Sequence, residues 1–218
     1  MRRLAALALV LLVVILLAVA QLVLPGIAAR SIRDRLAHSG QVLAVQVSAF
    51  PAIELLWHHA DSVVVRLGRY RSPPPQLAGT VSQAADVGSL TASVAELDTG
   101  LLTLRDATLR KRGSELIGTA EVTEADLRSA LPILQSVRPV ASGAGRLTLQ
   151  GTATLFGVSA TVDADVRAQN GAIVVAPDVP FGGFATVQAF SDPRIQVQSI
   201  GARPTAAGFS VFATGQLR

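Results

Sequence analysis

The sequence predicts an α+β fold: an N-terminal membrane helix followed by a mainly antiparallel, curved β-sheet domain with about three short helices. Three observations support this prediction. Residues 4–29 are uncharged and mostly apolar, and long stretches of alternating apolar and polar residues follow them. Gly, Pro and Asn-Gly sequences interrupt the alternation at short intervals, which is typical of strands joined by tight turns. About nine or ten strands are expected after the N-terminal run.

The longest alternating stretch runs from Arg146 to Ala176. Two-residue turns at 156–157 and 170–171 give pairs that are apolar on both strands: Leu155 with Val158, Ala153 with Ala160, Gly151 with Val162, Ala168 with Ile173, and Val166 with Val175. A slip of one residue would mix the two faces. We therefore predict a three-stranded antiparallel meander. Its apolar face is rich in Ala and Gly, so either a helix packs closely on it or a ligand that is not protein lies against it.

The N-terminal segment, residues 1–29, is predicted to be a transmembrane anchor or a signal peptide. Residues 4–24 would make a helix of about 31 Å, which is long enough to cross the hydrocarbon core of a bilayer. Arg2 and Arg3 favour a cytoplasmic N-terminus. A signal peptide cleaved after Ala20 is the alternative, and the protein would then be secreted. In both cases residues 30–218 form one domain on the extracytoplasmic side of the membrane.

Composition excludes several classes of function. The 218 residues include no Cys, so disulfides and cysteine nucleophiles are absent. The net charge is +4, yet no arginine cluster alternates with aromatic residues, and nucleic acid is therefore not an expected partner. Lys111 is the only lysine.

Shorter patterns give the remaining elements. Strands are expected around 42–48, 63–67, 90–94, 102–104, 107–109, 117–122, 195–200 and 209–212. A short helix is expected from Ile53 to Ala60, and a second from Leu127 to Leu134 behind a capping box at Thr123–Asp126. The prolines at 73–75 predict a loop.

No catalytic constellation is recognisable. His58, His59 and Asp61 are the best candidates for a metal or acid-base site, but adjacent histidines on a helix point about 100° apart and do not readily share one ion. Asp163 and Asp165 share a strand face with Thr148 and Gln150 opposite, which is typical of a solvated polar face. The sequence contains no nucleotide-binding or nucleophile-elbow motif, and no cofactor is expected.

The order of several short pieces resembles the LmeA-type phospholipid-binding family of bacterial cell-envelope proteins. These pieces are Phe50-Pro51 with Leu55-Leu56, Asp61 with Val63 and Val65, residues 124–127, residues 145–158, and the closing Pro-rich loop and strands to Gly215. The resemblance covers nearly everything after the N-terminal run, and none of its pieces is a catalytic signature.

The resemblance implies a membrane-tethered, non-enzymatic protein that binds phospholipid or a related glycolipid in an apolar groove and supports envelope lipid or lipoglycan metabolism or transport. The groove candidates are Leu149, Ala153, Leu155, Val158, Ala160, Val162, Leu127, Leu131, Phe181 and Phe184. Arg30 and Arg33 are candidates for headgroup contacts, or else belong to the solvated face of a helix. The alternatives are a structural platform without a lipid ligand and an envelope hydrolase that uses His58, His59 or Asp61.

Overall fold

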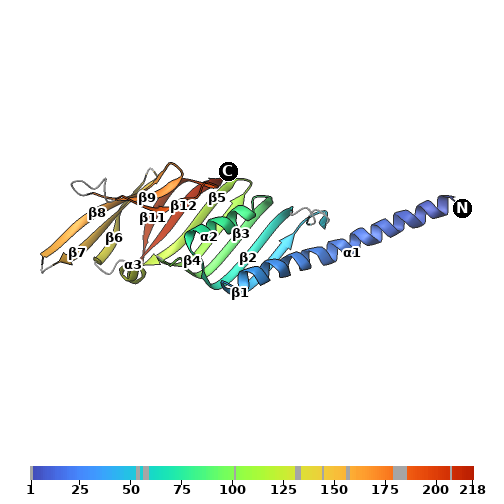
Figure 1. Cartoon of the computed structure of the whole chain (residues 1–218), viewed down its shortest axis with the longest axis horizontal. Coiled ribbons are helices and arrows are strands. Elements are labelled where there is room, and N and C mark those ends of the chain that lie inside the picture. Colours follow the sequence, from blue (N-terminus) through green and yellow to red (C-terminus); the bar gives the residue numbers. More distant parts are fainter. Residues whose placement is uncertain are drawn as a thin grey trace.

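The computed structural model describes residues 2–52, 55, 59–100, 102–130, 134–143, 145–155, 158–178, 186–206 and 208–218. Figure 1 shows an elongated molecule in which the long helix α1 (Arg2–Ala37) leads into two β-sheets. The larger sheet has the strand order β1 (Gly40–Ser48), β2 (Ala60–Arg71), β3 (Val87–Asp98), β4 (Thr103–Arg112), β5 (Glu115–Thr123), β12 (Gly208–Leu217) and β11 (Ile195–Thr205). The smaller has the order β10 (Val187–Phe190), β9 (Ala172–Pro177), β8 (Val158–Gln169), β7 (Arg146–Leu155) and β6 (Leu134–Gly143).

All strand pairs but one are antiparallel among the described residues, which confirms the predicted kind of sheet. The exception is β2 with β3, which run parallel. Parallel neighbours need a crossover connection, and helix α2 (Pro74–Gln83) provides it. Helix α2 therefore crosses one face of the larger sheet rather than lying at its edge (Figure 1).

The meander has the predicted register. The pairs Leu155–Val158, Ala153–Ala160, Gly151–Val162, Val166–Val175 and Ala168–Ile173 are all present between β7, β8 and β9. Asn170 and Gly171 have φ values of 53° and 81°, as a turn with positive φ at both central positions requires. The other turn, at 156–157, lies outside the described residues.

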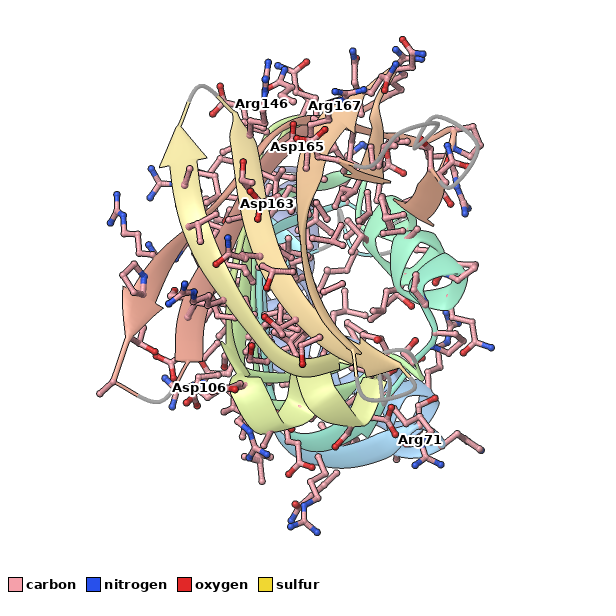
Figure 2. All side chains as sticks on the ribbon, turned by 90° about the vertical axis from the view of Figure 1, so that its left-hand side faces the viewer. Arg71, Asp106, Arg146, Asp163, Asp165 and Arg167 are labelled. Atoms are coloured by element: carbon pink, nitrogen blue, oxygen red, sulfur yellow. The ribbon has the colours of Figure 1, made fainter. Side chains whose placement is uncertain are left out.

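The outer face of the smaller sheet is polar, as predicted for Asp163 and Asp165. Thr148 donates to Asp165 at 2.8 Å, and Gln150 donates to Asp163 at 3.0 Å. Figure 2 shows both carboxylates on this face, with Arg146 and Arg167 towards one end of it. Cross-strand hydrogen bonds therefore account for these carboxylates.

Two local predictions were wrong. The prolines at 73–75 do not form a loop: Pro73 is the N-cap of α2 and Pro74 its first residue, a position where proline's missing N–H costs no helical hydrogen bond. The patterns at 102–104 and 107–109 belong to the single strand β4. Asp106, with a φ of 45°, shifts the register in its middle, and the alternation is therefore broken although the strand continues.

Two predicted segments are covered only in part. The expected helix from Ile53 to Ala60 lies mostly outside the described residues, and Ala60 itself begins β2. Helix α3 (Glu124–Ala130) starts at the predicted capping box, whereas Leu134 already belongs to β6, so that the chain is extended where the last predicted helical residue was expected.

In the described part of the chain, no helix has both the length and the hydropathy required to cross a membrane. The side chains of residues 1–18, which make up most of the predicted anchor, lie outside that part.

Two hydrophobic clusters hold the sheets. The first gathers β1, β2 and β3 around Val45, Val65 and Leu90, and Ile32 and Leu36 of α1 pack against it. The second joins the sheets, because Leu147 and Val166 of the smaller sheet pack with Ala202 and Phe209 of the larger one. The first cluster forms from elements that follow one another in the chain, from α1 to β4, whereas the second joins elements that are distant in the sequence.

Candidate functional site

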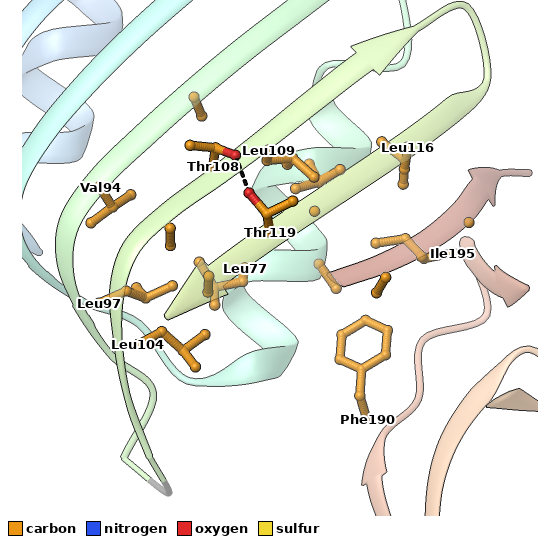
Figure 3. A pocket seen from close by; sticks show the side chains of 18 of the residues that line it. Leu77, Val94, Leu97, Leu104, Thr108, Leu109, Leu116, Thr119, Phe190 and Ile195 are labelled. Carbon is orange, nitrogen blue, oxygen red and sulfur yellow. Dashed lines mark hydrogen bonds between the residues drawn. The ribbon is translucent and has the colours of Figure 1, made fainter. Parts of the chain in front are cut away.

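A groove of about 450 Å³ lies between helix α2 and the larger sheet. This volume is within the usual range for sites that bind small molecules, about 300–1,000 Å³. Leu77, Ala78 and Val81 of α2 line one side, and residues of six strands from β2 to β11 line the other. Figure 3 shows the groove from close by, with α2 behind the strands and Phe190 of the smaller sheet at one margin. The groove thus runs across the strands rather than along them.

The floor of the groove follows the strand register. Residues that pair directly across strands point to the same face of a sheet. One such row crosses six strands: Val65, Ala92, Leu109, Gly118, Ala213 and Ile200. All six line the groove. Three of them, Ala92, Gly118 and Ala213, have side chains no larger than a methyl group, so their side chains fill little of the groove above the sheet.

Hydroxyl groups add little polarity to the groove. Besides Tyr70, the described lining residues with polar side chains are four threonines. Each threonine hydroxyl has a partner within the protein: Thr80 with the carbonyl oxygen of Gln76 at 3.0 Å, Thr108 with Thr119 at 2.6 Å, and Thr214 with Ser199 at 2.6 Å. By strand alternation, Thr108 and Thr119 point away from the face of Leu109 and Gly118.

No charged residue is present among the described residues that line the groove. The nearest charge in the floor rows is Lys111, which pairs with Leu90 and Leu116 and is 1% exposed. Its ammonium group donates to the carbonyl oxygens of Ala85, at 3.0 Å, and Val87. Ala85 lies in the turn after α2 and Val87 begins β3, so Lys111 holds the connection between the helix and the sheet.

Burial lowers the pKa of Lys111, and the nearby charge of Asp86 opposes this shift. The ammonium group is hydrogen-bonded to backbone carbonyls, so it does not point into the groove as a binding group for a ligand. The groove can therefore accept an apolar group, and none of its described lining residues carries a charge that could bind a polar group.

The end of helix α1 reaches the groove. Leu36 lines it, whereas Arg30 and Arg33 are exposed on the same helix. Residues three apart are neighbours on a helix surface, so Arg33 lies beside Leu36. The predicted headgroup candidate Arg33 is thereby within one helical turn of the groove lining.

Comparison with known proteins gives one strong match. The model of the LmeA-like phospholipid-binding family matches residues 17–208. The chain belongs to this family. The matched residues include every strand from β1 to β11 and helices α2 and α3, so the described groove lining lies in the part that the family shares, except for the residues of β12.

Other comparisons add no functional information. None of the curated proteins that were compared matches the chain. Among solved structures, the Zhui aromatase/cyclase from Streptomyces sp. R1128 is 15% identical, with 48% of this chain and 66% of that chain covered. Its TM-score is 0.21, which is too low to support a shared fold. The description of the LmeA-like family, in contrast, names phospholipid binding directly.

None of the groove candidates predicted from the sequence is among the described residues that line the groove. Leu149, Ala160 and Val162 are on the smaller sheet, and none of them is among the residues that line the groove. Ala160 is exposed. The positions of Ala153, Leu155 and Val158 are known only for the backbone, and Leu131, Phe181 and Phe184 lie outside the described residues. Leu127 is buried in the cluster that joins the two sheets.

Among the candidates for acid-base or metal chemistry, Asp61 has a structural partner. Asp61 accepts a hydrogen bond from the backbone N–H of Phe50 at 2.7 Å, which holds the turn after β1. His38 bonds the carbonyl oxygen of Asp34 at 2.8 Å, and His58 lies outside the described residues. In the part of the chain that the structure describes, no three histidine or acidic side chains form a group suited to a metal ion.

The groove could not be found from the sequence because its floor residues are scattered from position 65 to position 213. Two local signals point to it in retrospect. Gly118 interrupts the apolar side of β5, and Lys111 occupies an apolar position of β4 after Ala107 and Leu109. A glycine or a lone charge at a core position of a strand is unfavourable unless the surroundings require it.

Proposed function

We propose that this protein binds phospholipid, or a related glycolipid, by sheltering acyl chain in the groove between α2 and the larger sheet. The observation that carries the proposal is the lining: aliphatic and aromatic side chains cover both walls, and no charged residue is present among the described lining residues. Membership in the LmeA-like phospholipid-binding family supports the same ligand class.

The energetics of acyl-chain burial suit such a groove. Each methylene transferred from water contributes about 0.8 kcal/mol, so affinity accumulates with buried area and needs no specific polar contact. A charged headgroup would lose hydration inside the groove without gaining a partner. The headgroup therefore stays outside, where Arg30 and Arg33 on α1 are available to it.

A pair of alanine-to-tryptophan variants tests the location of the site. Ala92 lies in the groove floor, whereas Ala160 lies exposed on the smaller sheet. We expect Ala92→Trp to lower the amount of lipid that the purified protein takes up from phosphatidylglycerol vesicles by roughly tenfold, because the indole fills the floor, and Ala160→Trp to leave uptake unchanged. Uptake is measured by lipid extraction and mass spectrometry.

Two outcomes and one control are informative. Wild-type protein that carries no lipid and takes up none from vesicles would overturn the proposed function. Loss of uptake in Ala160→Trp but not in Ala92→Trp would move the site to the meander. Circular dichroism of each variant separates a filled groove from a protein that has not folded.

We also propose that the domain acts outside the cytoplasmic membrane, in the cell envelope, and contributes there to lipid or lipoglycan metabolism or transport. The support is the apolar run of residues 4–29 after Arg2 and Arg3. Fusion of alkaline phosphatase to the C-terminus of the full chain provides the test, since that enzyme is active only after export. An inactive but intact fusion would contradict the proposed location.

A further inference from the structure

Gly118 occupies the middle of the groove floor. It lies on β5, between Leu109 on β4 and Ala213 on β12, and is the fourth of the six residues in the row from Val65 to Ile200. Glycine in the interior of a strand weakens the strand, because it gains freedom on unfolding and has no side chain to pack. Such a glycine commonly marks a place where another molecule or backbone comes close.

No atom of the described residues requires glycine at this position. A Cβ atom at Gly118 would have the carbonyl oxygen of Thr108 as its nearest neighbour, at 3.9 Å, which is an ordinary contact. The backbone of Gly118 is not among those with positive φ. Gly215, which also lines the groove, is different: a Cβ atom there would lie 2.7 Å from the carbonyl oxygen of Gln196. Packing explains Gly215 and leaves Gly118 unexplained.

Because Gly118 lies in the middle of the floor, a long acyl chain would have to pass over it. Strands in a sheet lie about 4.8 Å apart, so a row across six strands is about 24 Å long. An acyl chain that fills one leaflet of a bilayer spans about 15 Å. Gly118 on β5 lies about 14 Å from the β2 end of the row and about 10 Å from the β11 end. An acyl chain of about 15 Å that lies along the row therefore crosses β5 at Gly118, whichever end it starts from.

We propose that Gly118 sets the length of the acyl chain that the groove accepts. This inference rests on the proposed function, because it assigns a specificity-determining role within the same groove. A side chain at position 118 would stand between Leu109 and Ala213 and divide the floor. The part from β2 to β4, about 10 Å long, would still accept a short chain.

The test uses the full-length protein and two forms of phosphatidylglycerol, with acyl chains of about eighteen and about eight carbons. Binding is measured for wild type, Gly118→Ala, Gly118→Val and Gly118→Leu. We expect Gly118→Leu to weaken binding of the long-chain lipid roughly tenfold or more, since displacing about two methylenes is enough for that loss. Binding of the short-chain lipid should change by less than about threefold.

Stability provides the second readout. A β-branched residue is favoured over glycine in a strand, and a Cβ atom has ordinary contacts here, so Gly118→Val should raise the urea midpoint while it weakens long-chain binding. Opposite signs for stability and binding exclude general damage to the fold. The matched control is Gly143→Val on β6, where a Cβ atom has no neighbour within 4 Å and the groove is not involved.

The possible results separate the two proposals. Unchanged long-chain binding in Gly118→Leu, or equal losses for long and short chains, would overturn the role of Gly118. Absence of binding in wild type would instead overturn the proposed function. If Gly118→Leu does not fold, the graded series Gly118→Ala and Gly118→Val decides, because the smaller side chains add one and three carbon atoms to an open position.

Discussion

At the scale of single residues, Lys111 shows how a charge is used inside an apolar structure. A buried ammonium group loses its hydration, and only hydrogen bonds or an opposite charge offset that cost. Lys111 obtains two backbone carbonyls, that of Ala85 in the turn after α2 and that of Val87 at the start of β3. It thereby holds the helix that forms one wall of the groove.

The pH dependence of stability is expected to reveal this residue. Burial lowers the pKa of Lys111 in the folded protein, whereas the unfolded chain returns to the ordinary value of 10.5. Between the two values the unfolded chain binds more protons, so the free energy of unfolding rises with pH across that window. We expect urea midpoints measured from near neutral pH to about 10.5 to show this rise in wild type and not in Lys111→Met.

Lys111→Arg is the matched control, since arginine keeps the charge and the donors but does not titrate in this range. It should lack the rise as well. A rise of equal size in all three proteins would assign the titration to another group.

At the scale of elements, the start of helix α3 depends on a small polar network. The Thr123 hydroxyl accepts from the Asp126 N–H at 3.1 Å and donates to the Asp126 carboxylate at 2.6 Å. Arg105 of β4 bonds the same carboxylate at 3.0 Å and 3.3 Å. The Arg105 guanidinium holds the pKa of Asp126 below its usual range, and the Thr123 hydroxyl adds to this. The capping box thus also ties α3 to the larger sheet.

Removal of the cap should lower stability by a predictable amount. Thr123→Ala deletes the acceptor for a helix N–H, which typically costs about 1 kcal/mol, and Thr123→Ser restores it. Because the folded pKa of Asp126 is lowered, its contribution is present above the ordinary value of 3.8 and is lost as pH falls through the folded value. Urea unfolding near neutral pH measures the first effect. Equal stability of the Ala and Ser variants would contradict it.

The same scale explains why strand prediction succeeded better than helix prediction. Alternation and turn residues specify β7, β8 and β9 locally, and a one-residue slip would expose every apolar side chain of a strand. The three prolines at 73–75 carry an ambiguous signal, since proline favours both loops and the first turn of a helix. The helix is favoured because Leu77 packs against the apolar face of the larger sheet.

At the scale of the whole molecule, the two sheets depend on one shared cluster. One end of the apolar face of the meander, around Leu147 and Val166, is covered by the end of the larger sheet together with Leu127 of α3, and not by a helix alone. Leu147, 2% exposed, lies at its centre. At this end of the meander, the two sheets therefore pack directly against each other.

Truncation of Leu147 tests this contact. Leu147→Ala should lower the free energy of unfolding by about 2–5 kcal/mol, because it removes transfer energy and leaves a cavity between the sheets. Val140→Ala, at a side chain that is 46% exposed, should change it by no more than about 0.5 kcal/mol. Chemical unfolding followed by circular dichroism gives both values. A loss below about 1 kcal/mol for Leu147→Ala would mean that the sheets hold together elsewhere.

The sequence by itself determined the local features: the meander register, the helix cap at Thr123 and the apolar run before residue 30. These depend on residues close together in the chain, where periodicity, turn geometry and capping act. The tertiary structure alone decided where the groove lies. Leu109 and Gly118 pair across the hairpin of β4 and β5, but Ala213 becomes the other neighbour of Gly118 only because β12, which follows the smaller sheet in the chain, pairs with β5. No local pattern encodes that pairing, since it depends on long-range contacts between apolar faces.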